Sequence, residues 1–460
     1  MIQTKKDWNF YKRILAIAIP IVIQNGISSF VSLLDNIMVG QVGTIPMSGV
    51  SIANQLFTIY ALCIFGASAG AGIFTAQFYG KNDMEGVRNT FRFKYIICTL
   101  LSLLGMVVFV LWDEPLLSMY LTGEGDPAAA AQTLAEARDY VWVNLWGFIP
   151  FALANAYSST LRETGKTVVP MVGGITAVLV NLALNYLLIF GHFGLPEMGV
   201  RGAAVATVVS RFVELSIVAG WMHLNRNKAA PYIRGVYRSF KIPGTLLKSV
   251  TGKCIPLLAN EFLWSTGIAL LNQSYSTCGL DVVPALNISA TIQNLANVVS
   301  IALANAIGIT MGQMLGAGKS REELKQANGK LLNLSILCGA VFGVLLLLVA
   351  ELFPLLYNTT DQVRSLASSL IRVTALMMPL IAYSLATYFT LRSGGQVFIT
   401  FLFDSCFMWV CPVVLAFLLS RFTDMGIVAM YAICQGVDVI KAGFGTWLIR
   451  KGVWIRDLTQ

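Results

Sequence analysis

The chain contains very little charge. Asp, Glu, Lys and Arg together make up 12% of its 460 residues, whereas soluble proteins carry about 25%. So few charges cannot cover the surface of a soluble protein of this length, which excludes an ordinary cytosolic enzyme, a disordered chain and a disulfide scaffold. Apolar residues make up 56%, which is enough for about twelve membrane-crossing helices of about 20 residues each.

Groups that carry enzymatic or cofactor chemistry are also scarce. The two histidines, His192 and His223, fall in predicted loops and lack the spacing of metal ligands. The eight cysteines are scattered through apolar runs without a Cys-x-x-Cys pair, which is typical of small packing residues. No HExxH, GxSxG or phosphate-loop motif is present. We therefore expect no cofactor. A membrane-embedded enzyme is an alternative class of protein, and an assay of substrate turnover would test it.

Long apolar runs fill most of the chain. Continuous runs of this length predict an all-α membrane protein of twelve transmembrane helices, because a membrane barrel would show alternating runs of about ten residues. The predicted helices cover residues 14–39, 50–78, 93–111, 139–161, 168–190, 200–222, 254–277, 284–311, 331–356, 366–391, 398–420 and 426–448.

Basic residues are distributed unevenly among the loops. The side that holds both termini carries 25 Lys and Arg residues, and the opposite side carries 5. Since cytoplasmic loops are enriched in basic residues, both termini are predicted to be cytoplasmic, and the net charge of +9 does not indicate nucleic-acid binding. The longest basic loop divides the chain into a six-helix lobe (1–222), a cytoplasmic linker (223–253) and a second six-helix lobe (254–460).

The two halves of the sequence resemble each other. A shift of 236 positions superposes four pairs of residues, which are Pro20 and Pro256, Gly43 and Gly279, Gln77 and Gln313, and Gly80 and Gly316. Shifts of 230 and 227 positions superpose Leu161-Arg162 on Leu391-Arg392, Gly165 on Gly395, and Met198-Gly199 on Met425-Gly426. Matches that follow one another along several helix pairs indicate a duplication. Because six helices is an even number, both halves enter the membrane from the same side, and we predict two pseudo-symmetric lobes around a central cavity.

Seven ionisable residues fall inside the predicted helices away from their ends, where a charge in mid-membrane costs about 2.5–3.5 kcal/mol. They are Asp35, Arg211, Glu214, Glu261, Asp404, Asp438 and Lys441. Spacings of three residues predict two structural pairs, Arg211 with Glu214 and Asp438 with Lys441. The remaining three acids have no basic neighbour on their own helix, so they are the better functional candidates, unless another helix holds them or they are protonated.

One group of polar residues falls at a similar depth in the outer half of the first lobe. It consists of Asp35, Asn181, Asn185 and Thr207. Asn181 and Asn185 are four residues apart and therefore share a helix face. A carboxylate, two amides and a hydroxyl offer the hard oxygen ligands that suit Na⁺, whereas the carboxylate alone suffices for a proton. We predict a cation site here and leave both ions open.

A second group is predicted to contact the transported substrate. Glu261 and Asp404 lie about 9–10 Å from the cytoplasmic ends of their helices. Asn25 and Asn294 belong to polar stripes on the first and eighth predicted helices, and such stripes face protein or water. Tyr383 offers an aromatic face to a cation, although aromatic residues more often serve packing. Together with Asp35 these residues form the predicted substrate set.

Several segments resemble the multidrug and toxic compound extrusion (MATE) family of bacterial type, over essentially the whole chain. They are PIVIQNGISSFVSLLDNIMVGQVG (20–43), GASAGAGIFTAQFYG (66–80), Leu161-Arg162 with Gly165, GAAVAT (202–207), Pro256 with Glu261, and LRSGG (391–395). The resemblance implies a cation-coupled antiporter with two six-helix lobes arranged in a V. It implies that the cation site falls on Asp35, Asn181, Asn185 and Thr207, and that Glu261 is the acid of the seventh helix.

The sequence is thus identified as a secondary active transporter rather than an enzyme. We expect it to export small cationic amphiphilic compounds by alternating access, in exchange for H⁺ or Na⁺, as a monomer in the inner membrane of a bacterium. The alternative is a flippase for lipids or lipid-linked oligosaccharides with the same broad fold. Acids that lack a basic neighbour on their own helix favour a cationic ligand over a phosphate.

Overall fold

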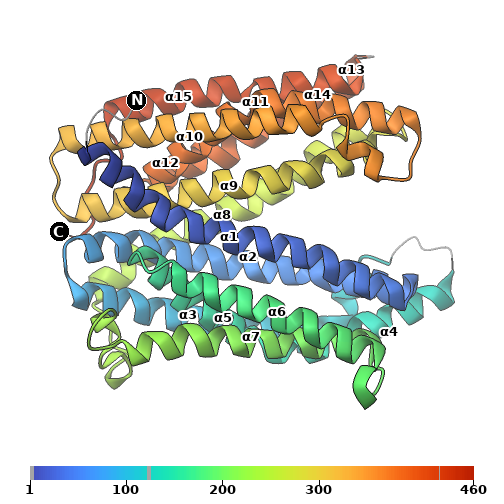
Figure 1. Cartoon of the computed structure of the whole chain (residues 1–460), viewed down its shortest axis with the longest axis horizontal. Coiled ribbons are helices and arrows are strands. Elements are labelled where there is room, and N and C mark those ends of the chain that lie inside the picture. The colour runs from blue at the N-terminus through green and yellow to red at the C-terminus, as the bar shows by residue number, and fades with distance from the viewer. Residues whose placement is uncertain (1–4, 122–125, 424, 460) are drawn as a thin grey trace. The chain divides into compact units, whose positions relative to one another are not determined.

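The computed structural model describes residues 5–121, 126–423 and 425–459, with side chains for all of these except 5–7, 33, 36 and 37. Throughout these ranges the chain is helical and has no β-strand (Figure 1). The α-helices are α1 (Lys5–Val42), α2 (Thr44–Gly80), α3 (Met84–Ser118), α4 (Pro127–Asn144), α5 (Phe148–Glu163), α6 (Val168–Phe190), α7 (Gly199–Leu224), α8 (Gly244–Ser276), α9 (Val282–Gly316), α10 (Arg321–Val349), α11 (Asp361–Ser393), α12 (Val397–Phe401), α13 (Val414–Phe422), α14 (Ile427–Gly436) and α15 (Asp438–Lys451).

Short helical turns connect several of these helices. The 3₁₀ turns are η1 (Leu145–Gly147), η2 (His192–Gly194), η3 (Pro231–Ile233), η4 (Val236–Arg238) and η5 (Phe353–Leu356). Two π-helical turns, η6 (Leu402–Cys406) and η7 (Trp409–Val413), join α12 to α13. The eleventh predicted helix therefore exists, but it is wound more loosely over about half of its length than an α-helix would be.

The predicted all-α membrane architecture is confirmed. Eleven helices of the described ranges are long and apolar enough to cross a membrane. The fourth predicted helix (139–161) lies on α4 and α5, which η1 separates, so it is not counted among the eleven. On α3, Leu100, Leu104, Val107 and Leu111 are exposed at spacings of three and four, which places an apolar stripe where lipid would contact the helix.

Side-chain caps extend some helices beyond their apolar runs. Asp83 accepts hydrogen bonds from the Glu85 and Gly86 amides, which starts α3 nine residues before the run at 93. Ser320 and Glu323 form a capping box at the start of α10. These capped extensions carry helices past the apolar segments into the connecting loops.

The contacts divide the chain into two compact units. The N-unit comprises Ile23–Thr75 and Asp83–Cys254, and the C-unit comprises Met1–Val22, Ala76–Asn82 and Ile255–Gln460. Three helices belong to both units, since α1 changes unit after Val22, α2 after Thr75 and α8 after Cys254. The start of each half's first helix, α1 or α8, is therefore part of the unit formed mainly by the other half.

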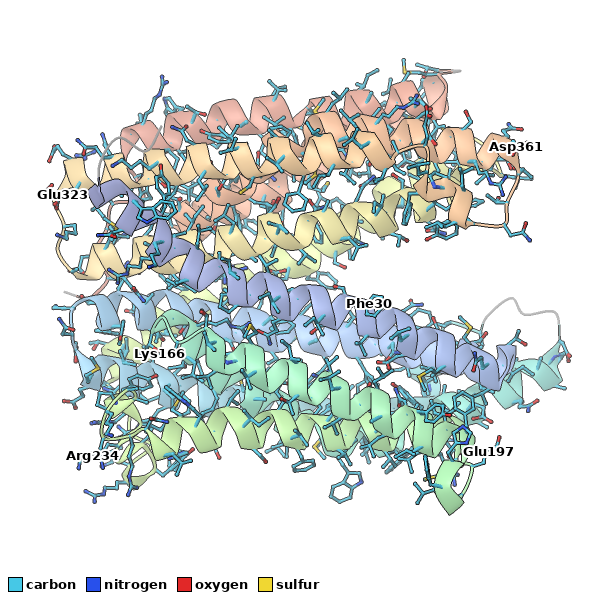
Figure 2. All side chains as sticks on the ribbon, in the orientation of Figure 1. Phe30, Lys166, Glu197, Arg234, Glu323 and Asp361 are labelled. Atoms are coloured by element: carbon cyan, nitrogen blue, oxygen red, sulfur yellow. The ribbon has the colours of Figure 1, made fainter. Side chains whose placement is uncertain are left out.

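In the N-unit, α6 and α7 pack along each other (Figure 1). Gly202 makes this possible, because a Cβ at that position would lie 2.7 Å from the Leu188 backbone. Figure 2 shows Lys166 and Arg234 at one end of the N-unit and Glu197 at the other, as expected of helices that cross a bilayer and return.

The predicted linker is folded rather than extended. Its last ten residues begin α8, and η3 and η4 occupy its middle. Arg88 of α3 donates to the Tyr232 carbonyl at 3.2 Å, and Arg92 donates to the Val236 carbonyl at 2.9 Å. These two arginines therefore hold the linker against α3 within the N-unit.

In the C-unit, α9, α10 and α11 form a packed group. The end of α2 lies against the end of α9 in a reciprocal way, because a Cβ at Gly80 would overlap the Gln313 carbonyl and a Cβ at Gly316 would overlap the Gln77 carbonyl. Two residue pairs that the sequence repeat superposes thus meet each other. Only glycine permits so close an approach of two backbones.

Candidate functional site

The four residues of the predicted cation site meet within the N-unit. Asp35 lies on α1, Asn181 and Asn185 lie on α6, and Thr207 lies on α7. Asn185 Nδ2 donates to Asp35 Oδ1 at 2.8 Å, and Asn181 Nδ2 lies 3.3 Å from Thr207 Oγ1. With its amide turned, Asn181 donates instead to Asp35 Oδ2 at 3.0 Å. The arrangement therefore gathers one carboxylate, two amides and one hydroxyl.

An oxygen of this group has no partner. Asn185 is 2% exposed, and its Oδ1 atom is buried without a hydrogen bond from any described residue. Leaving a buried carbonyl oxygen unpaired costs about 1–3 kcal/mol, so such atoms usually have a water, ion or ligand beside them. The Asn185 amide thus donates to Asp35 with one atom and keeps an oxygen available beside the carboxylate.

Two cavities flank Asp35. One, of about 460 Å³, is lined by Asp35, Asn54, Tyr140, Asn185 and Arg211, among others. The other, of about 290 Å³, is lined by Asp35, Asn25, Asn181 and Arg211, among others. Both are lined entirely by residues of the N-unit. Asp35 is therefore accessible to a small solute from two directions, and Asn25 joins it at the second cavity.

Arg211 belongs to the candidate site, which the sequence analysis did not predict. The predicted pair with Glu214 is confirmed, with Nη1 at 3.3 Å from Oε2, and the guanidinium also lies 4.9 Å from the Phe151 ring centroid. It nevertheless lines both cavities with Asp35. None of the ion pairs found among the described side chains includes Asp35. Asp35 thus keeps an unpaired carboxylate near a partly compensated cation.

Another residue of the site escaped the sequence analysis. Tyr140 of α4 lines the larger cavity together with Thr207. Away from this site, the sequence analysis also missed a buried ion pair, because Lys94 of α3 is fully buried and pairs with Glu163 at the end of α5. Tyr140 gave no signal, because an aromatic residue in an apolar run is usually a packing residue. Lys94 gave none because it stands at the start of its predicted helix (93–111), where a basic residue is common.

Asp404, in the C-unit, is not alone. Lys441 of α15 donates to its Oδ1 atom at 2.8 Å, and Asn260 of α8 lies 3.3 Å from its Oδ2 atom. The predicted partner of Lys441 was Asp438 on the same helix. The ion pair with Asp404 shows that the lysine reaches across to the π-turn η6 instead, while Asp438 also acts on it electrostatically.

The other predicted substrate residues are dispersed over both units. Glu261 lies on α8 next to Asn260, and no hydrogen bond of its carboxylate is found within the described ranges. Tyr383 of α11 bonds Thr446 at 2.6 Å, and Asn294 lies exposed on α9. Glu261 and Asp404 are electrostatic neighbours, whereas Asn25 and Asp35 belong to the N-unit.

Comparison with known proteins identifies the family. The sequence profile of the MatE family matches residues 20–187 and again residues 256–418. The chain belongs to the MATE family of transporters. The two matches begin at Pro20 and Pro256, which are the residues that the predicted duplication superposes, so each half matches the same family profile.

Individual MATE relatives are similar over nearly the whole length. A probable multidrug resistance protein NorM from Thermotoga maritima is 23% identical over 428 residues, which is 91% of this chain and 88% of the relative. A solved structure of MATE in complex with MaL6 superposes with a TM-score of 0.86 at 20% identity and covers 96% of both chains. An outward-facing multidrug resistance MATE transporter of the MOP superfamily gives a TM-score of 0.85 at 20% identity, again over 96% of both chains.

The donor set bears on which ion the site could hold. In the part of the chain that the structure describes, no three His, Cys, Asp or Glu side chains come together as a metal site. The group at Asp35 instead combines one acid with neutral oxygens. Such a set matches a monovalent cation or a proton better than a divalent metal, which generally needs more charged ligands.

Proposed function

We propose that this MATE transporter is an antiporter that exports small cationic amphiphilic compounds in exchange for H⁺ or Na⁺. The observation that carries the proposal is the unpaired carboxylate of Asp35 between two cavities, beside the unpaired Asn185 Oδ1. The name of the NorM relative, a multidrug resistance protein, supports the same class of cargo.

The coupling ion is proposed to bind at Asp35. A proton would neutralise the carboxylate, which the Asn185 amide holds at 2.8 Å. A sodium ion would use the ionised carboxylate together with the Asn185 and Asn181 carbonyls and the Thr207 hydroxyl. Either ion would remove the net negative charge that attracts a cationic cargo to the same cavities, which is the physical basis for exchange.

Movement of α1 is proposed to link ion binding to release of the cargo. Pro20 removes a backbone donor inside α1, and it lies two residues before the helix changes unit after Val22. Pro256 has the equivalent place in α8, directly after the change of unit at Cys254. Each proline weakens its helix where the chain passes from one unit to the other, which supports bending there during alternating access.

The membrane of action is proposed from the loop charges and from the relatives. Both termini would face the cytoplasm of a bacterium, since the basic loops alternate with loops that carry few basic residues. The helices make this a multi-pass membrane protein. We propose that the chain acts as a monomer, since each half already supplies the helix start that completes the unit formed mainly by the other half.

A flippase for lipids or lipid-linked oligosaccharides is the second candidate. The presence of Arg211 in both cavities favours it, because a guanidinium binds phosphate well. The ion pair between Arg211 and Glu214 weakens this support, since part of that charge is already compensated. Saturable binding of an anionic lipid headgroup that Arg211→Ala abolishes would favour the flippase.

The decisive experiment is transport in proteoliposomes with sodium and pH gradients imposed separately. The wild type should extrude ethidium in response to one of the two gradients, which identifies the ion. Asp35→Asn removes the ionisable group but keeps one oxygen that can accept from Asn185, so it should abolish gradient-driven efflux while the protein still inserts. Asp361→Asn is the control, because Asp361 is 98% exposed at the start of α11. Normal efflux by Asp35→Asn would refute the coupling role.

A further inference from the structure

A shallow apolar groove of the C-unit contains a single cationic side chain. The groove, of about 230 Å³, is lined by the aromatic rings of Phe403, Phe407 and Phe444, by Cys406 and Val410, and by Lys441. The Lys441 ammonium lies 5.2 Å from the Phe403 ring centroid and 2.8 Å from Asp404 Oδ1. An ammonium group held by one carboxylate and an aromatic ring at the edge of an apolar groove has the surroundings that a protein offers to an organic cation.

The Asp404 carboxylate is positioned independently of Lys441. Its second oxygen lies 3.3 Å from Asn260 Nδ2, and Asn260 is 2% exposed. Ser405 donates to Asn260 Oδ1 at 2.8 Å, so the amide nitrogen has to face the carboxylate. Ser405 and Asp404 belong to the same π-turn, which explains why neighbouring residues can both reach α8. Removal of the lysine would therefore leave an ordered acid.

The charge near the groove is also unbalanced. Lys441 pairs with Asp404, and Asp438 also acts on it electrostatically, so two acids lie near one ammonium group. Lys441 and Asp404 keep 15% and 19% of their side-chain surface exposed, and Lys441 lines the groove with Asp404 directly behind its ammonium group. A surplus of negative charge beside aromatic walls favours a cation with an apolar body over an anion.

We propose that Lys441 is an internal competitor that occupies a binding subsite for aryl-alkyl ammonium compounds. The cargo places its ammonium group on Asp404 and its aryl group against the rings of the groove, and Lys441 swings aside. The tethered ammonium competes with the bound cargo for Asp404, which lowers the affinity for the cargo and lets it dissociate. Lys441 thus determines specificity, since only amines that outcompete it are retained.

This inference rests on the proposed function, because it names a subsite for the proposed cargo. The test is calorimetric binding of phenethylammonium to the purified full-length protein. Lys441→Met keeps the length of the side chain and removes its charge, and it should tighten binding about tenfold. Asp404→Asn should weaken binding, and the double variant should bind no better than Asp404→Asn alone. Phe444→Ala should weaken binding without altering any charge.

Lys451→Met is the matched control. It removes a lysine from the same helix, where the ammonium lies 4.0 Å from the Trp447 centroid and outside the groove, and it should leave affinity unchanged. Unchanged or weaker binding by Lys441→Met would overturn the proposal. Binding of phenylacetate that Lys441→Met abolishes would also overturn it, because the groove would then hold anions. If Lys441→Met does not fold, unchanged affinity in either Asp404→Asn or Phe444→Ala is sufficient to reject it.

Ethidium efflux by the same preparations separates this inference from the proposed function. A wild type that exports ethidium, combined with unaltered binding in the variants, rejects the subsite alone. A wild type that exports no cation under either gradient rejects the transport proposal, whatever the binding results are.

Discussion

The buried pair between Lys94 and Glu163 should contribute strongly to the stability of the N-unit. Lys94 is 0% exposed on α3 and also donates to Thr160 Oγ1 at 3.2 Å, while Glu163 ends α5. A Cβ at Gly72 would overlap the Glu163 carboxylate, so α2 packs closely over the pair. Removing one member would leave the other charge buried without its partner, which typically costs about 3–5 kcal/mol.

Three variants test this magnitude. Lys94→Met and Glu163→Gln should each lower the free energy of unfolding by about 3–5 kcal/mol. The double variant should lose less than the sum of the two, because neither charge then remains. Reversible unfolding in mixed detergent micelles measures the free energies directly. In thermal scans each single variant should unfold at least about 6 °C below the wild type.

An exposed pair of the same residue types provides the control. Lys319 and Glu323 lie 3.8 Å apart with about half of each side chain exposed. Lys319→Met should therefore cost less than about 1 kcal/mol. A loss below about 1 kcal/mol for Lys94→Met, or strictly additive losses in the double variant, would show that the pair contributes no more than a surface pair and would refute the reasoning.

Two further predictions concern the backbone. Gly80→Ala should destabilise by about 1–3 kcal/mol or more, because its Cβ would overlap the Gln313 carbonyl, whereas Gly329→Ala, with no heavy atom within 4 Å of its Cβ, should be neutral or stabilising in the same thermal assay. Pro20→Ala and Pro256→Ala should restore a helical donor, stiffen α1 and α8, and slow ethidium efflux several-fold with unchanged drug affinity. Equal melting of the two glycine variants, or normal efflux rates in the proline variants, would contradict these expectations.

Much of the fold was predictable because membrane helices have a strong signal. Burial in lipid requires long continuous apolar runs, and these runs located the helices, including the interrupted fourth one. The boundaries were less predictable. Caps such as Asp83 and Ser320 extend helices through polar sequence, where hydropathy gives no signal. The π-turns around Asp404 also have no distinct composition.

The candidate sites were predictable where the spacing of residues on a single helix was enough to place them on the same face. Asn181 and Asn185 share a face at a spacing of four, and the structure brings them together with Asp35 and Thr207. Pairing across helices was not predictable, because the rotation of one helix against another is not encoded in spacing. Lys441 was assigned to Asp438 for this reason, although its 2.8 Å contact is with Asp404.

The exchange of helix starts between the units has a consequence for the evolution and engineering of the chain. Residues up to Val22 complete the C-unit, and residues 244–254 of α8 complete the N-unit. A gene cut at the middle would yield two fragments that each lack a helical segment of their own unit. Neither fragment should be soluble in detergent by itself, but the two should reassociate when they are produced together. An ancestral half-length protein with this architecture would have worked only as a homodimer in which each subunit supplied the first turns of its first helix to the other subunit. Fusion of the two genes then made this exchange part of a single chain.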